Sequence, residues 1–126
     1  TVLFLAPPPA DARERFPHAR CVGLAGTARC RDPAWMDREL PAAFDSLARL
    51  GALILQYKVC STFDSSPAIG SIGRAIDIGV KCMPGRWSPM VVAAPRLGRY
   101  QAFGNLFARA NDQAHRLDAR PNAASS

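Results

Sequence analysis

The sequence predicts an α/β fold: a three-layer sandwich with a mostly parallel sheet, helices on both faces, and a β-ribbon near the C-terminus. The apolar runs at 52–55 and 90–94 lack polar alternation, which is typical of parallel strands buried on both faces. Apolar stripes at helical spacing precede and separate these runs, so strands and helices alternate along the chain. Gly98 and Gly104, with Asn105, predict the ribbon over 99–107.

The first part of the chain is predicted to contain two short strands. Val2 to Leu5 is apolar, and the prolines at 7–9 give it a rigid exit. Asp11 to Phe16 is predicted to form a helical turn, and Val22 to Ala25 the second strand. These elements begin the alternation of strand and helix.

The first long helix is predicted from its start signal and its apolar stripe. Asp32 followed by Pro33 is typical of a helix N-terminus, with a capping carboxylate and a proline at the first helical position. Pro41 lies inside the helical pattern and is predicted to kink or split the helix. The stripe, which Gly51 ends, contains Met36, Leu40, Phe44, Leu47 and Leu50.

A central strand is predicted over 52–59, followed by a polar turn and a helix from about Pro67 to Lys81. We expect Ser65 or Ser66 to cap this helix. Gly70 and Gly73 lie three residues apart, and we expect them to allow close packing of the helix on a strand. A further buried strand over 90–94 leads to a two-stranded ribbon at 99–107, with its turn at 104–105.

The candidate site lies where the predicted central strand ends and the next helix begins. Open α/β sheets bind ligands at this edge, and free amides at a helix N-terminus attract anions. Lysine and hydroxyl side chains add charge and directional hydrogen bonds, so the segment is predicted to hold a carboxylate or phosphate. Arg99 is a further candidate partner for such an anion. The candidates in this segment are Lys58, Ser61, Thr62, Asp64 and Ser65.

Each candidate also has a purely structural interpretation. Lys58 could extend into solvent from a strand end, and Ser61 and Thr62 could form side-chain turns. Asp64 and Ser65 could serve only to start the helix, and Arg99 could form a surface salt bridge. The residues alone leave these alternatives open.

Two long motifs at these positions resemble a known family. KVCSTFDSSPAIGSIGRAIDIG at 58–79 and VVAAPRLGRYQAFGNLFA at 91–108 look like the amino-terminal, sugar-acid-binding domain of the four-carbon acid sugar kinases. The resemblance covers residues 1–118. It implies an ATP-dependent kinase that phosphorylates threonate, erythronate or 3-oxo-tetronate at a terminal hydroxyl. It also implies that a larger second domain binds ATP and Mg²⁺, and it favours a role for Lys58 toward the ligand.

The chain departs from the family pattern at both ends. The family begins with a strand ending in D-D-x-T-G-A, which this sequence does not contain, and residues 119–126 read as a small polar tail that we expect to be disordered. We therefore expect a partial substrate-binding domain over 1–118 that is inactive alone and binds no cofactor itself. No catalytic residue is assigned. A stand-alone small-acid-binding module without catalysis, and a structural fragment without a ligand, are the alternatives.

Composition argues against several other classes. The net charge of +6 raises nucleic-acid binding, but the arginines are spread along the chain and no nucleic-acid-binding motif is present, so no such partner is expected. A positive surface also concentrates small anions. No apolar run approaches the roughly 20 residues of a membrane span, and no membrane partner is expected. We expect a homodimer, because exposed sheet edges can pair with a second copy of the chain.

Cysteine and histidine usage predicts neither a metal site nor disulfides. The four cysteines contain no C-x-x-C pair, and only two histidines are present. Reduced thiols and a cytoplasmic location are the expectation. Cys60 alone lies in the candidate segment, either as a nucleophile or, as we prefer, as a small buried residue beside the loop.

Overall fold

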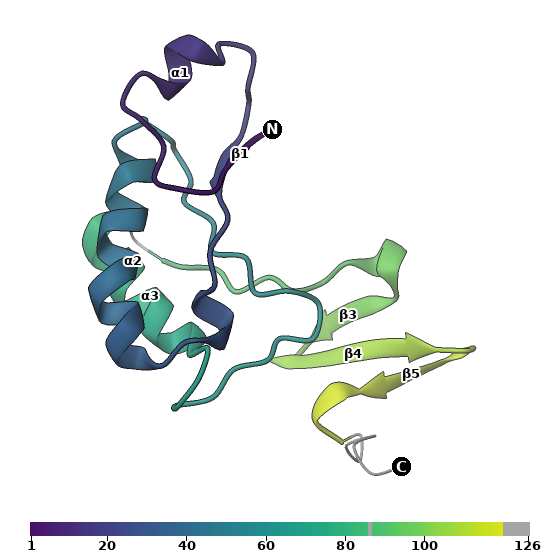
Figure 1. The fold of residues 1–126 in the computed structure, drawn as a ribbon. Helices are drawn as coiled ribbons and strands as arrows, with labels where there is room; N and C mark the ends of the chain where they lie inside the picture. Colours follow the sequence, from purple (N-terminus) through teal and green to yellow (C-terminus); the bar gives the residue numbers. More distant parts are fainter. Residues whose placement is uncertain (86, 120–126) are drawn as a thin grey trace. The chain divides into compact units, whose positions relative to one another are not determined.

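A computed structural model describes residues 1–85 and 87–119 (Figure 1). These residues form two compact units. Of the described residues, unit one comprises 1–58, 65–85 and 87–88, and unit two comprises 59–64 and 89–119. The predicted disordered tail at 119–126 lies, apart from Ala119, outside the described residues.

Unit one contains a two-stranded parallel sheet. Strand β1 (Val2–Phe4) pairs with β2 (Val22–Leu24), and the short helix α1 (Ala12–Arg15) lies between them in the sequence. The rings of Phe4 and Phe16 meet edge to face with their centroids 6.0 Å apart, so β1 contacts the end of α1. The two predicted strands and the helical turn are confirmed.

Helix α2 (Pro33–Ala48) begins as its start signal predicts. The Asp32 carboxylate accepts a hydrogen bond from the Trp35 amide at 2.8 Å, and Pro33 occupies the first helical position. The predicted split at Pro41 is wrong, because one continuous helix passes through this residue. A proline removes only one helical amide, and buried side chains on either side of Pro41, Met36 and Phe44, hold the helix in place.

Helix α3 (Ile72–Cys82) packs against α2 and forms the core of unit one with it (Figure 1). Its predicted start at Pro67 is wrong, and so is the predicted cap at Ser65 or Ser66. Ser71 caps the helix by accepting a hydrogen bond from the Arg74 amide. The helix cannot begin earlier because Gly70 has a left-handed backbone, with φ of +63°. The buried core residues are Ala28, Met36, Leu40, Phe44, Ala75 and Ile78.

The predictions of strands at 52–59 and 90–94 are wrong, since the structure assigns no strand to either segment. Leu55 and Tyr57 pack against the helical core, whereas Leu53 is 95% exposed and Ile54 82%. A strand is defined by its hydrogen-bonded neighbours, and the described residues provide no ladder partner for 52–59. The α/β class and the C-terminal antiparallel strands are confirmed, while the three-layer sandwich is not confirmed.

Unit two contains a three-stranded antiparallel sheet, in which β4 (Asn105–Ala110) lies between β3 (Arg99–Ala102) and β5 (Gln113–Arg116). The sequence predicted only two strands with a turn at 104–105. The turn is instead at Phe103 and Gly104, whose φ values of 50° and 74° match the left-handed pair that a tight two-residue hairpin needs. Short 3₁₀ helices at Pro95–Leu97 and Leu117–Ala119 flank the sheet.

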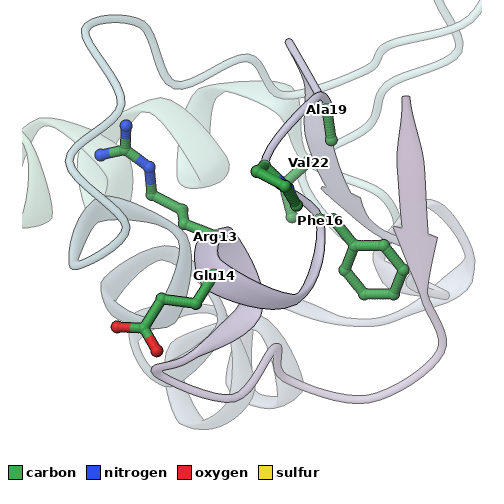
Figure 2. A pocket seen from close by; sticks show the side chains of 6 residues that line it. Arg13, Glu14, Phe16, Ala19 and Val22 are labelled. Carbon is green, nitrogen blue, oxygen red and sulfur yellow. The ribbon is translucent and has the colours of Figure 1, made fainter.

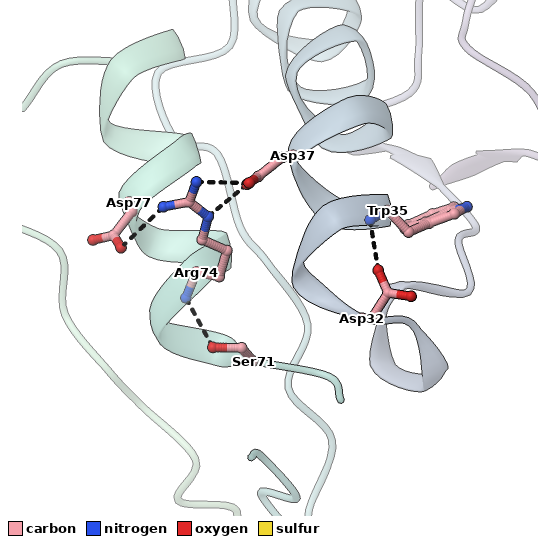
Figure 3. Close-up of polar contacts among 6 residues, drawn as sticks. All are labelled: Asp32, Trp35, Asp37, Ser71, Arg74 and Asp77. Carbon is pink, nitrogen blue, oxygen red and sulfur yellow. Dashed lines mark hydrogen bonds and ion pairs between the residues drawn. The ribbon is translucent and has the colours of Figure 1, made fainter. Parts of the chain in front are cut away.

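An ion pair joins the two long helices at their surface (Figure 3). The Arg74 guanidinium donates from both Nε and Nη2 to the Asp37 carboxylate, with Nη2 to Oδ2 at 2.7 Å, and a second acid, Asp77, lies 3.9 Å from Nη1. The hydrogen bonds from Arg74 hold the pKa of Asp37 below its usual value, and the same bonds raise the pKa of Arg74. Both side chains remain about two-fifths exposed, so solvent weakens the pair.

We expect this ion pair to contribute a small pH-dependent part of stability. Because folding lowers the pKa of Asp37, the contribution is present above the ordinary carboxyl pKa of 3.8 and is lost as the pH falls through the lowered value. Urea midpoints of the native protein and of Asp37→Asn should therefore differ at pH 7 and converge toward pH 3. A difference that stays constant across this range would contradict the assignment.

Candidate functional site

The segment 59–64, called the 59–64 loop below, belongs to unit two and carries the centre of the predicted site. Cys60 and Phe63 both have left-handed backbones, with φ of 60° and 57°. Residues other than glycine and asparagine rarely adopt this conformation, which costs roughly 1–3 kcal/mol per residue and is held only by surrounding structure. The two bends lie on either side of Ser61 and Thr62, whose backbone is therefore tightly constrained.

Two predicted site residues form a polar pair in this loop. The Thr62 hydroxyl donates a hydrogen bond to the Asp64 carboxylate at 2.5 Å, and both side chains are exposed. With its proton directed at Asp64, the Thr62 oxygen retains lone pairs that accept from other donors. An exposed carboxylate beside a hydroxyl suits the O–H groups of a polyol and repels an anionic group.

Arg99, the first residue of β3, brings its guanidinium to backbone oxygens within unit two. Its Nε donates to the Ser61 carbonyl at 3.3 Å, and its Nη1 lies 3.3 Å from the carbonyls of both Leu97 and Gly98. The structure therefore brings Arg99 together with the 59–64 loop within unit two. The contact is made through main-chain oxygen atoms, and no sequence signal indicates it.

The other two predicted residues, Lys58 and Ser65, belong to unit one, where they flank the loop in sequence. Lys58 is exposed. The Ser65 hydroxyl accepts a hydrogen bond from the Ile72 amide at 3.0 Å, seven residues further on. Ser65 therefore contacts the first residue of α3, although it is not the cap of that helix.

The N-terminus of α3 is less open to an anion than the sequence suggests. The Ile72 amide is bonded to Ser65, the Arg74 amide to the Ser71 hydroxyl, and the Ala75 amide to the Ser71 carbonyl. An anion at this terminus would compete with these serine oxygens. These amides of the helix start therefore already have partners within unit one.

A shallow pocket of about 290 Å³ opens elsewhere in unit one (Figure 2). None of the predicted site residues lines it. One of its lining residues, Arg13, donates to the Leu50 carbonyl at 3.0 Å, which connects α1 to the end of α2. The lining residues are Arg13, Glu14, Phe16, Pro17, Ala19 and Val22.

Neither a metal-binding cluster nor a membrane-spanning helix is found in the part of the chain that the structure describes. Within 1–85 and 87–119, no three or more histidine, cysteine or acidic side chains are grouped so that they could hold a metal ion. Over the same residues, no helix has the length and apolar character needed to cross a bilayer. The four cysteines form no disulfide among the described residues, and Cys60 is half-buried in the 59–64 loop.

Comparison with known proteins identifies the family. The family described as "Sugar-binding N-terminal domain" matches residues 1–126. A 3-oxo-isoapionate kinase from Paraburkholderia graminis is 65% identical over 121 residues, which are 96% of this chain and 26% of the kinase. The chain thus spans about a quarter of the length of this curated relative, and no solved structure matches it. The kinase resemblance seen in the two sequence motifs is confirmed, and the chain belongs to the family of sugar-binding N-terminal domains.

Proposed function

We propose that this chain is the sugar-acid-binding part of an ATP-dependent kinase that phosphorylates a terminal hydroxyl of its substrate. The observation that carries the proposal is the 65% identity to a kinase across nearly the whole chain. The kinase is named for 3-oxo-isoapionate, a sugar acid, and the sequence motifs led us to expect the acids threonate, erythronate or 3-oxo-tetronate. We therefore propose a small sugar acid, with a carboxylate and several hydroxyls, as the ligand class.

The arrangement of the 59–64 loop supports such a ligand. Thr62 and Asp64 offer exposed oxygen atoms that accept hydrogen bonds from sugar hydroxyls. Lys58, which directly precedes the loop in sequence, offers a positive charge to the carboxylate. We therefore assign hydroxyl recognition to the loop and charge recognition to the lysine.

ATP and Mg²⁺ belong, in this proposal, to the part of the kinase that this chain does not span. Phosphoryl transfer depends on metal ions and donors arranged around the phosphates. Within residues 1–85 and 87–119, no three or more acidic, histidine or cysteine side chains are grouped so that they could hold a metal ion. We expect this chain to bind the sugar acid without catalysing transfer alone.

The experiment that tests this proposal is isothermal titration with threonate, erythronate, 3-oxo-isoapionate and ATP, each added separately. We expect one of the acids to bind and ATP not to bind the 126-residue chain. Lys58→Ala should weaken acid binding about 10- to 100-fold, which is the effect of losing one charge-assisted contact. Acid-dependent ATP hydrolysis by the full-length protein is the corresponding activity measurement.

Lys81 provides the matched control, because it is the only other lysine in the sequence. It lies in the last turn of α3 and is exposed. Lys81→Ala removes the same charge from the same unit and should leave acid binding unchanged. Equal losses of affinity in the two variants would mean that Lys58 acts only through the overall charge of the protein. Absence of acid binding in the native protein would overturn the proposed function.

A further inference from the structure

The backbone on both sides of Arg99 is fixed within unit two. The amide and carbonyl of Arg99 both pair with Ala94, at 3.1 and 3.0 Å. Gly98, the preceding residue, has φ of +65° and lies so close to β4 that a Cβ atom there would be 2.9 Å from the Cβ of Arg109. The Arg109 amide also donates to the Gly98 carbonyl at 2.7 Å. The Arg99 side chain therefore starts from a rigid part of the sheet.

The guanidinium of Arg99 meets main-chain oxygens from two separate segments. Nη1 donates to the carbonyls of Leu97 and Gly98, which lie just before β3. Nε donates to the Ser61 carbonyl, 38 residues earlier in the sequence. Hydrogen bonds from a charged donor are about twice as strong as neutral ones. The contacts thus join the 59–64 loop to the edge of the sheet through one planar group.

Ser61 is the point of the loop at which such an attachment has most effect. It follows the left-handed Cys60 and precedes Thr62, and the left-handed Phe63 separates Thr62 from Asp64. Strained backbone of this kind persists only where neighbouring structure determines it. A donor that fixes the Ser61 carbonyl also fixes the peptide plane shared with Thr62, and hence the direction from which the Thr62 hydroxyl reaches Asp64.

We infer that Arg99 is a positioning residue, which holds the 59–64 loop in its ligand-binding conformation through the Ser61 carbonyl. The inference rests on the proposed function in one respect, namely that the loop contacts the sugar acid. It replaces the direct contact between Arg99 and a ligand carboxylate that the sequence suggested. Lysine cannot reproduce the role, because a single ammonium group lacks the planar fork that reaches both segments.

The test compares Arg99→Lys and Arg99→Gln with the native protein in the full-length chain. The first measurement is hydrogen exchange of the loop amides without ligand. We expect exchange in the peptide that covers 59–64 to become at least about tenfold faster in both variants, because loss of the Ser61 contact raises the population of open loop. Unchanged exchange would overturn the inference.

The second measurement separates positioning from direct contact by using a charged and an uncharged ligand. Titration with threonate and with threonamide, its neutral amide, should show the same fold loss of affinity for both ligands in Arg99→Gln. Arg99→Lys should show that loss as well, although it keeps the charge. A loss confined to threonate, or rescue by lysine, would overturn the inference in favour of a direct contact with the carboxylate.

Arg109→Gln is the matched control. Arg109 is on the neighbouring strand β4, next to Ala108, the residue that pairs with Arg99, so its side chain points to the opposite face of the sheet. Among the described residues, its guanidinium contacts the Asn111 carbonyl and the Asp112 carboxylate, both in the turn after β4. This variant should leave both measurements unchanged. If the native protein binds none of the sugar acids named under the proposed function, that function fails, and the exchange measurement still decides whether Arg99 holds the loop.

Discussion

Replacing Gly70 with alanine is expected to lower the free energy of unfolding of unit one by about 2–4 kcal/mol, through combined strain and overpacking. Gly70 is buried, has φ of +63°, and precedes the cap of α3. A Cβ atom there would lie 2.4 Å from the Arg29 carbonyl oxygen, much closer than such atoms ever approach. The Gly70 amide donates to the Arg31 carbonyl at 2.9 Å, so the backbone cannot rotate away without losing that bond.

Gly73→Ala is the control for this prediction, and its expected effect has the opposite sign. Gly73 lies in the first turn of α3 and is exposed, and the nearest atom to an added Cβ, the Ser71 hydroxyl oxygen, is 4.0 Å away. Alanine in an ordinary helical conformation should stabilise the protein by up to about 1 kcal/mol. Urea denaturation followed by circular dichroism measures both variants. Equal effects would contradict the structural difference between these two glycines.

The two glycines also show what the sequence could reveal about α3. The spacing of Ile69, Ile72, Ile76 and Val80 fits a helix that starts near Pro67, and both glycines appeared to lie on it. The left-handed backbone at Gly70 results from its contact with the segment around Arg29, far away in sequence, and no local pattern encodes that contact. The start of α2, at Asp32 followed by Pro33, was predicted correctly because its cap is a local contact.

The candidate site was predictable to a similar degree. The polar segment after residue 57 was recognisable from composition, and the family from its motifs. The contact between Arg99 and the Ser61 carbonyl could not be predicted, because no sequence pattern indicates which main-chain oxygen lies beside a given arginine side chain. The left-handed conformations of Cys60 and Phe63 could not be predicted from the sequence either, since neither residue type favours positive φ.

The side chains packed between α2 and α3 are expected to determine the stability of unit one. The apolar run at 52–55 looked like the centre of the fold, yet the core of unit one lies between α2 and α3. Phe44 is 6% exposed, meets the ring of Tyr57 edge to face at 6.2 Å, and packs over Gly79 on α3. Phe44→Ala should therefore reduce the free energy of unfolding by about 3–5 kcal/mol. Urea denaturation monitored by circular dichroism measures this loss.

Ile54→Ala in the 126-residue chain distinguishes the two possible positions of the core. Ile54 belongs to the apolar run but is 82% exposed, so its truncation should change the free energy of unfolding by less than about 0.5 kcal/mol. A buried strand would instead lose about 2–5 kcal/mol at this position. A loss of that size would therefore restore the sequence prediction of a central strand at 52–59. A negligible loss beside a large one at Phe44 means that the helix pair, and not the apolar run, holds unit one together.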